Sequence, residues 1–235
     1  MRTPTRIALS LLIASVAAIK IFLQGSVPGF LQGDDVETME AAFRAAFGLV
    51  YDDWEIRSHL LSELVVAPVL RAASLVPGIT TDGLLLAGSL PFVLAGALAT
   101  GLVFRLAVRW GSSEGEALAA ATLYAVHAIP VAYGIGGFPR ALVTPLILGA
   151  ALLAGSHRAP ALLVAGALLG LAGAARYSEW MFLLPLLATV LIPKGAPRSG
   201  NGPPQAVPTL IGFLAGAAIV GAYDAISGEG AFSSL

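Results

Sequence analysis

Seven long runs of apolar residues constrain this chain more than any other feature of its sequence. They occupy residues 7–23, 83–104, 117–131, 141–154, 161–175, 180–192 and 207–223. Charged residues make up 11% of the chain, against about 25% in an ordinary soluble domain, so a soluble fold would lack a polar surface. A helix needs about 20 residues to cross a hydrocarbon core of about 30 Å, and the shorter runs reach this length only with their flanking residues. The sequence therefore predicts an all-α, polytopic membrane helix bundle of about seven transmembrane helices.

The first run follows Arg2 and Arg6, as the apolar part of a signal peptide would. No small-x-small cleavage site follows it, so we expect an uncleaved first helix, with Lys20 snorkelling to the outer interface. Small residues recur in the later runs, as in GALLGLAGAA at 166–175 and GFLAGAA at 212–218. Such residues let helix backbones approach closely in a membrane bundle.

The distribution of basic residues predicts the orientation of the bundle. With the N-terminus in the cytoplasm and seven spans, seven basic and two acidic residues fall inside, while six basic and twelve acidic residues fall outside. This agrees with the positive-inside rule. A span at residues 60–76 would reverse every later loop, so this stretch is expected to form an amphipathic surface helix in a long outer loop at 24–81. The Pro- and Gly-rich residues 193–208 are expected to form a cytoplasmic linker.

Acidic residues are concentrated in this outer loop. Residues 33–63 hold more than half of the 14 acids of the chain: Asp34, Asp35, Glu37, Glu40, Asp52, Asp53, Glu55 and Glu63. Chemistry on that face has no supply of ATP or nucleotide sugars. A transferase there would need an activated donor that arrives through the membrane, and a sugar linked to a lipid phosphate is the obvious candidate.

The residue order of the loop resembles that of the GT-C glycosyltransferases, in the mannosyltransferase branch that builds dolichol-linked oligosaccharides and GPI anchors. The matching elements are QGDD at 32–35, Glu40, Gly48, DWE at 53–55, Arg57-Ser58 and Pro68. The loop departs from the family pattern where Gln32-Gly33 replace His-Pro, Asp35 replaces Glu, and the second Trp is missing. Arg176 and Tyr223-Asp224 resemble later outer-face positions of the family more weakly.

The resemblance implies a hexosyltransferase, mannosyltransferase-like, that moves a sugar from a polyprenyl phosphate to a lipid-linked glycan or another acceptor. Members of the family are longer, so residues 1–235 are expected to be one module, either lacking a C-terminal part or needing a partner subunit. No cofactor or metal is expected besides the lipid-phosphate donor. Membrane lipids, the donor and a glycan or glycolipid acceptor are the expected partners, and a net charge of −1 gives no indication of nucleic acid.

Glycosyl transfer with inversion needs a base to take the acceptor proton, and Asp34 or Asp35 is the candidate. Alternatively, Asp34 caps a helix that begins near Val36, with Glu37 at its third position. The two roles are compatible, because Asp34 can cap the helix while Asp35 points into a cavity.

Six further residues are candidates for binding the substrates: Glu40, Trp54, Glu55, Arg57, Arg140 and Arg176. A guanidinium group matches the oxygens of a lipid phosphate, which favours the three arginines. The alternative is that these arginines anchor helices at the interface or pair with Glu55, Glu179 or Asp224. Trp54 fits an aromatic belt equally well.

Two other interpretations involve histidines. His59 and Glu63 lie one helical turn apart, but with three histidines and no cysteine a solvated helix face is favoured over a metal site. His127 lies within a predicted span, where we expect it to hydrogen-bond between packed helices. A transporter would carry more charge inside its spans and often inverted repeats, so a small transporter-like bundle is disfavoured, while a catalytically silent membrane subunit stays open.

Overall fold

The computed structural model describes residues 1–26, 34–48, 58–175, 177–191 and 205–226. In these residues every regular element is a helix and there is no strand. The all-α prediction is therefore confirmed for this part of the chain. The residues in between are outside the described structure.

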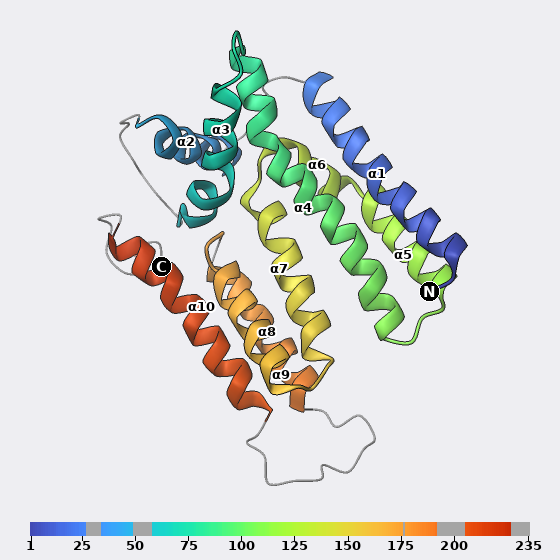
Figure 1. Cartoon of the computed structure of the whole chain (residues 1–235). Coiled ribbons are helices and arrows are strands. Elements are labelled where there is room, and N and C mark those ends of the chain that lie inside the picture. Colours follow the sequence, from blue (N-terminus) through green and yellow to red (C-terminus); the bar gives the residue numbers. More distant parts are fainter. Residues whose placement is uncertain (27–33, 49–57, 176, 192–204, 227–235) are drawn as a thin grey trace.

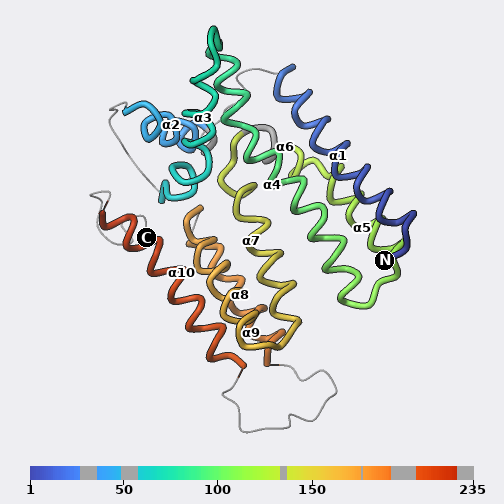
Figure 2. The backbone as a smooth tube through the Cα atoms, viewed as in Figure 1, coloured from blue at the N-terminus to red at the C-terminus, as the bar shows by residue number. Residues whose placement is uncertain are grey.

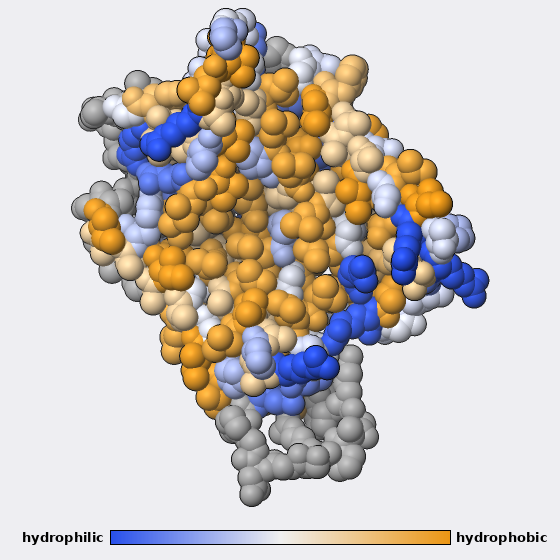
Figure 3. Space-filling view, in the orientation of Figure 1, coloured by the Kyte–Doolittle hydropathy of each residue, from blue (hydrophilic) through white to orange (hydrophobic). Residues whose placement is uncertain are grey.

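Three helices are long and apolar enough to cross a membrane: α1 (Thr3–Ser26), α4 (Thr81–Arg109) and α10 (Ala206–Ile226). They contain 24, 29 and 21 residues, against the roughly 20 that a span needs. They cover the predicted runs at 7–23, 83–104 and 207–223. Apolar side chains cover the middle of the face shown in Figure 3, with hydrophilic ones toward both ends. These features are those of a membrane protein.

The remaining apolar runs form shorter elements. They are α5 (Glu114–Val126), α6 (Ala128–Gly136), α7 (Pro139–Ala154), α8 (Ala159–Ala172), the 3-10 helix η2 (Tyr177–Phe182) and α9 (Leu183–Leu191). In Figures 1 and 2, α7 runs beside α4, and α8 lies between α7 and α10. None of these elements is long enough to be a span by itself, so the seven-span arrangement stays a prediction.

The predicted run at 117–131 is divided in two at His127. The His127 side chain is exposed, and its Nδ1 accepts a hydrogen bond of 3.3 Å from the Ile129 N–H, which caps α6. The prediction that His127 bonds between packed helices is therefore wrong. The physical reason is its backbone, which is extended at His127 (φ −65°, ψ 136°), so that one helix ends there and another begins.

The segment that is predicted to form an outer loop contains three short helices in the described residues. These are α2 (Asp34–Phe47), the π-helix η1 (Ser62–Val66) and α3 (Ala67–Ser74), which Figure 1 shows together beside the start of α4. The stretch at 60–76, predicted as one amphipathic helix, forms η1 and α3. Its buried side includes Val66 and Leu70, which pack in one cluster with Met39 of α2 and Phe92 of α4. This cluster fixes α2, η1 and α3 onto the bundle.

The helices α8 and α10 cross with their backbones in close contact. Four glycines form the crossing, and a Cβ on any of them would overlap a backbone carbonyl oxygen of the other helix: Gly166 with Thr209, Gly170 with Phe213, Gly212 with Leu163, and Gly216 with Ala167. Only residues without a side chain permit such a close approach of the two backbones. Motifs of small residues have the same effect in other pairs of membrane helices. The expectation from the small residues is confirmed at this crossing.

Candidate functional site

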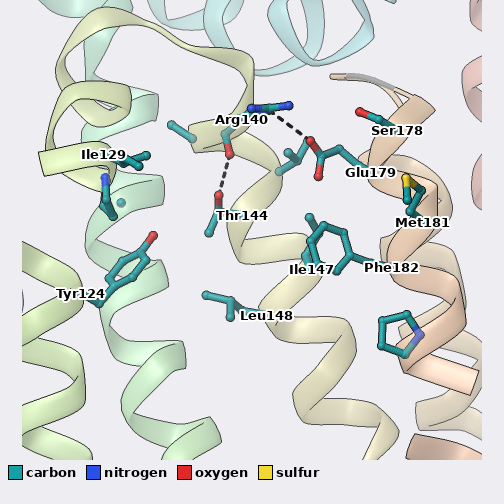
Figure 4. Close-up of a pocket in the computed structure, with 15 residues that line it drawn as sticks. Tyr124, Ile129, Arg140, Thr144, Ile147, Leu148, Ser178, Glu179, Met181 and Phe182 are labelled. Carbon is teal, nitrogen blue, oxygen red and sulfur yellow. Dashed lines mark hydrogen bonds and ion pairs between the residues drawn. The ribbon is translucent and has the colours of Figure 1, made fainter. Parts of the chain in front are cut away.

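A cavity of about 780 Å³ lies between α4, the α5–α6 junction, α7, η2 and α9. Most of its wall is apolar, and Figure 4 shows Ile129, Ile147, Leu148, Met181 and Phe182 around it. Its polar groups are the side chains of Tyr124, Arg140, Thr144, Ser178 and Glu179. The cavity thus combines a long apolar wall with a small charged group, as a site for an amphiphile does.

The charged group of the cavity is an ion pair between Arg140 and Glu179. The Arg140 Nε lies 3.2 Å from Glu179 Oε1 (Figure 4). Arg140 follows the proline that starts α7, and its side chain is 40% exposed, whereas that of Glu179 is 11% exposed. A carboxylate that is this buried needs a cationic partner, because desolvation disfavours an isolated charge. This pairing is the alternative that the sequence left open for Arg140.

The helix η2 holds Glu179 in place through its neighbours on both sides. The Tyr177 hydroxyl donates a hydrogen bond of 2.7 Å to Asp224 Oδ2 of α10, and Asp224 is 1% exposed. The Trp180 Nε1–H donates a hydrogen bond of 2.9 Å to the Gly170 carbonyl oxygen of α8. Side chains on either side of Glu179 are therefore bound to two different helices, which orients Glu179 toward α7.

The candidate base residues lie at the beginning of a helix. Asp34 and Asp35 are the first two residues of α2, so the helix begins two residues before the predicted start at Val36. The side chains of both aspartates are outside the described structure, and the cap prediction is not tested. A carboxylate at this end is favoured by the helix dipole. Glu40, five residues after Asp35 in α2, is exposed.

The helix α2 packs against the part of α7 that carries Arg140. Met39 and Ala42 of α2 are buried in one cluster with Ala141 and Leu142 of α7. Ala141 follows Arg140 in the chain and also lines the cavity. The helix that begins with Asp34 and the charged group of the cavity therefore lie at the same end of the bundle.

The other predicted site residues are not placed by the structure. Trp54, Glu55, Arg57 and Arg176 all lie outside the described residues. Of the eight candidates, the structure gives side-chain surroundings for Glu40 and Arg140 only. The sequence suggested Glu179 only as a possible ion-pair partner of an arginine. Its place in the lining of the cavity was not predicted. Its position between Tyr177 and Trp180, at the start of an apolar run, was the available signal.

A second polar group links η1 to the end of α10. The Glu63 carboxylate lies close to the Tyr223 side chain. His59 is 4% exposed, and its carbonyl oxygen accepts the Glu63 N–H at 3.0 Å. The solvated face predicted for His59 and Glu63 is therefore wrong for His59, because η1 packs against the bundle. Among the residues that the structure describes, no three His, Cys, Asp or Glu side chains gather as a metal site would require.

The fold and the cavity together define an all-helical membrane protein with a partly apolar cavity that ends in an ion pair. Comparisons with models of known protein families, with curated proteins and with solved structures find no match for this chain. Its function is therefore inferred from the site and from the residue pattern of the outer loop.

Proposed function

We propose that this chain is a membrane glycosyltransferase of the GT-C type. It moves a hexose, mannose-like, from a polyprenyl-phosphate donor to a lipid-linked glycan or another acceptor on the non-cytoplasmic face. The observation that carries the proposal is the position of the Arg140–Glu179 pair, at the end of an apolar cavity and beside the helix that begins with Asp34 and Asp35.

The cavity suits the lipid part of such a donor. Its volume lies within the range of about 300–1,000 Å³ that small-molecule sites occupy. Two of its apolar side chains, Ile129 and Met181, are 54% and 72% exposed. Apolar side chains this exposed in a membrane protein face lipid, so a prenyl chain would enter the cavity directly from the bilayer.

Arg140 is the group that would hold the phosphate. Its guanidinium matches phosphate oxygens. The phosphodiester of the donor carries one negative charge and the departing polyprenyl phosphate gains a second, so the phosphate competes better with the Glu179 carboxylate as the leaving group forms. Ser178 and Thr144 add hydroxyl groups to the same lining. Arg57 and Arg176 would contribute further cations, as the family resemblance implies.

The reaction requires one proton transfer and one displacement at the sugar. Asp34 or Asp35 takes the proton of the acceptor hydroxyl, and the acceptor oxygen forms a bond to the anomeric carbon. The bond from that carbon to the phosphate oxygen breaks, and its electron pair leaves with the polyprenyl phosphate. Arg140 neutralises the charge that develops on the leaving phosphate. Glu40, Trp54 and Glu55, which lie in the part of the loop that resembles the family, are further candidates for substrate binding.

Transfer from defined donors tests the proposal. The purified full chain in liposomes should transfer labelled sugar from a polyprenyl-phosphate donor to a lipid-linked glycan, and should not use a nucleotide sugar when that lipid is absent. Arg140→Gln should raise the KM for the donor, whereas Arg105→Gln, at an exposed position of α4, should not. Direct use of a nucleotide sugar by the purified protein would refute the proposal.

A further inference from the structure

Lys20 of α1 is buried in the bundle instead of reaching the interface. The residue is 2% exposed, and its Nζ donates a hydrogen bond of 2.9 Å to the Pro130 carbonyl oxygen of α6. The predicted snorkelling of Lys20 is therefore wrong. The physical reason is Gly96 of α4: a Cβ at this position would overlap the Lys20 Nζ, so the absence of a side chain makes room for the ammonium group.

The ammonium group of Lys20 lies directly behind the wall of the cavity. Both residues that it contacts, Gly96 and Pro130, line the cavity. Ile129, the neighbour of Pro130, lies across the cavity from Glu179 in Figure 4. A cation is thus held on the wall opposite the Arg140–Glu179 pair.

The charge of Lys20 is not balanced by the lining of the cavity. Among the described lining residues the charged side chains are Arg140 and Glu179, and these two form an ion pair with each other. Lys20 itself forms no ion pair within the described ranges of the chain, and its hydrogen-bond acceptor is the neutral carbonyl group of Pro130. Because a membrane protein interior screens charge weakly, the ammonium group imposes a positive potential on the cavity.

We infer that Lys20 makes this cavity selective for anionic amphiphiles, of the prenyl phosphate type, over neutral amphiphiles with the same chain. A buried ionisable residue within a membrane is costly, and such residues mark functional sites. Lys20 acts here through the thin wall at Gly96, without touching the ligand. The inference rests on the proposal that the cavity is the donor site. It adds the reason why this site would prefer a negatively charged ligand.

Equilibrium binding of two matched probes tests this inference. Farnesyl phosphate and farnesol are titrated into the purified full chain in a non-ionic detergent, and the ratio of their two affinities is measured by calorimetry. We expect the wild-type protein to prefer farnesyl phosphate. Lys20→Met should lower the ratio of the two affinities on the order of tenfold. This is the effect of removing one unit charge about 10 Å from the ligand at an effective dielectric constant of about 20. Farnesol binding itself should change little.

Control variants separate charge from structure. Lys20→Gln removes the charge but keeps a donor for the Pro130 carbonyl, so it should lower the ratio as well, and it replaces Lys20→Met if that variant does not fold. Arg105→Met removes one charge from the exposed side of α4 and should leave the ratio unchanged. An unchanged ratio in a folded Lys20 variant, or an equal loss in Arg105→Met, would overturn the inference.

Inorganic phosphate distinguishes an amphiphile site from a simple anion site. It should not displace farnesyl phosphate at equal concentration, because it gains nothing from the apolar wall. Displacement as strong as that by unlabelled farnesyl phosphate would overturn the assignment to an amphiphile. None of these measurements involves sugar transfer, so failure of the transferase proposal and failure of this inference are observed separately.

Discussion

The Tyr177 hydroxyl donates a hydrogen bond of 2.7 Å to the Asp224 carboxylate, across a separation of 47 residues in the chain. This contact joins η2 to the end of α10. Asp224 is 1% exposed, so the hydroxyl group supplies a hydrogen-bond donor to one oxygen, Oδ2, of a carboxylate that water does not reach. Because Glu179 follows Tyr177 by two residues, the same contact positions the acid that pairs with Arg140 at the cavity.

Loss of this hydroxyl should destabilise the protein. A hydrogen bond to a charged group contributes about 1.5–3 kcal/mol, and Tyr177→Phe should lower the free energy of unfolding by about that amount. Tyr124→Phe is the matched control, since no hydrogen bond of the Tyr124 hydroxyl is found within the described residues. Denaturant unfolding in detergent measures both variants, and equal stability of Tyr177→Phe and wild type would contradict the structure here.

The glycine crossing of α8 and α10 predicts a strong positional effect of a single methyl group. In Gly212→Ala the new Cβ meets the Leu163 carbonyl oxygen, so the helices must separate, and overpacking of this kind costs about 1–3 kcal/mol or more. Gly115→Ala makes the same chemical change where nothing lies within 4 Å, and should stay within about 1 kcal/mol of wild type. Thermal unfolding of the two variants side by side gives the comparison, and similar losses in both would argue against the close crossing.

Glu114 connects the start of α5 to the start of α1. Its carboxylate accepts hydrogen bonds from the Thr5 hydroxyl at 2.6 Å and from the Arg2 N–H at 3.1 Å, and the N-terminal ammonium group lies 3.3 Å away. These contacts, the Thr5 hydroxyl first, lower the pKa of Glu114 from 4.5 to about 2. The charged form is therefore the one that the folded state favours.

The free energy of unfolding should depend on pH through Glu114, in the interval between its folded-state and unfolded-state pKa values. Because the folded-state pKa is depressed, the contribution of Glu114 is fully present above pH 4.5 and is lost as the pH falls toward 2. The difference in Tm between wild type and Glu114→Gln should therefore be constant at neutral pH and shrink over that interval. A difference that persists unchanged at pH 2 would show that the carboxylate charge is not the cause.

The predicted topology can be tested because the chain contains no cysteine. A cysteine introduced at Gln32 should react with an impermeant thiol reagent added outside intact cells, and one at Ser199 should not. The expectation follows from the excess of basic residues in the loops assigned to the cytoplasm. Labelling at both positions, or the reverse pattern, would exclude the seven-span orientation and with it the need for a lipid-linked donor.

The base assignment predicts a loss of activity without a loss of stability. Asp34→Asn or Asp35→Asn should reduce sugar transfer by about 10²-fold or more, the usual scale for loss of a general base. Asparagine caps a helix nearly as well as aspartate, so thermal stability in detergent should be retained. Full transfer activity in both variants would end the catalytic interpretation of α2, and Asp34 is the first of the two to test.

The positions of the three longest helices were predictable from the sequence, although each helix extends beyond its apolar run. Hydropathy depends on local composition, so the runs at 7–23, 83–104 and 207–223 correspond to α1, α4 and α10. The small residues of 166–175 and 212–218 likewise predicted a close helix contact. The break at His127 was not predictable, because a run of apolar residues shows the same hydropathy whether its backbone is continuous or turns.

The partners of the charged side chains were decided by the tertiary structure alone. Arg140 was compatible with a phosphate, the interface or three different acids, and only the placement of η2 by Tyr177 and Trp180 brings Glu179 to it. Lys20 was expected at the interface, and only the packing of α1 on Gly96 and α6 buries it. Composition alone determines that this chain belongs in a membrane, because the free energy of burying apolar surface is a sum over residues and does not depend on which residues are in contact. The position of each charge depends on contacts between residues far apart in sequence, which no local pattern records.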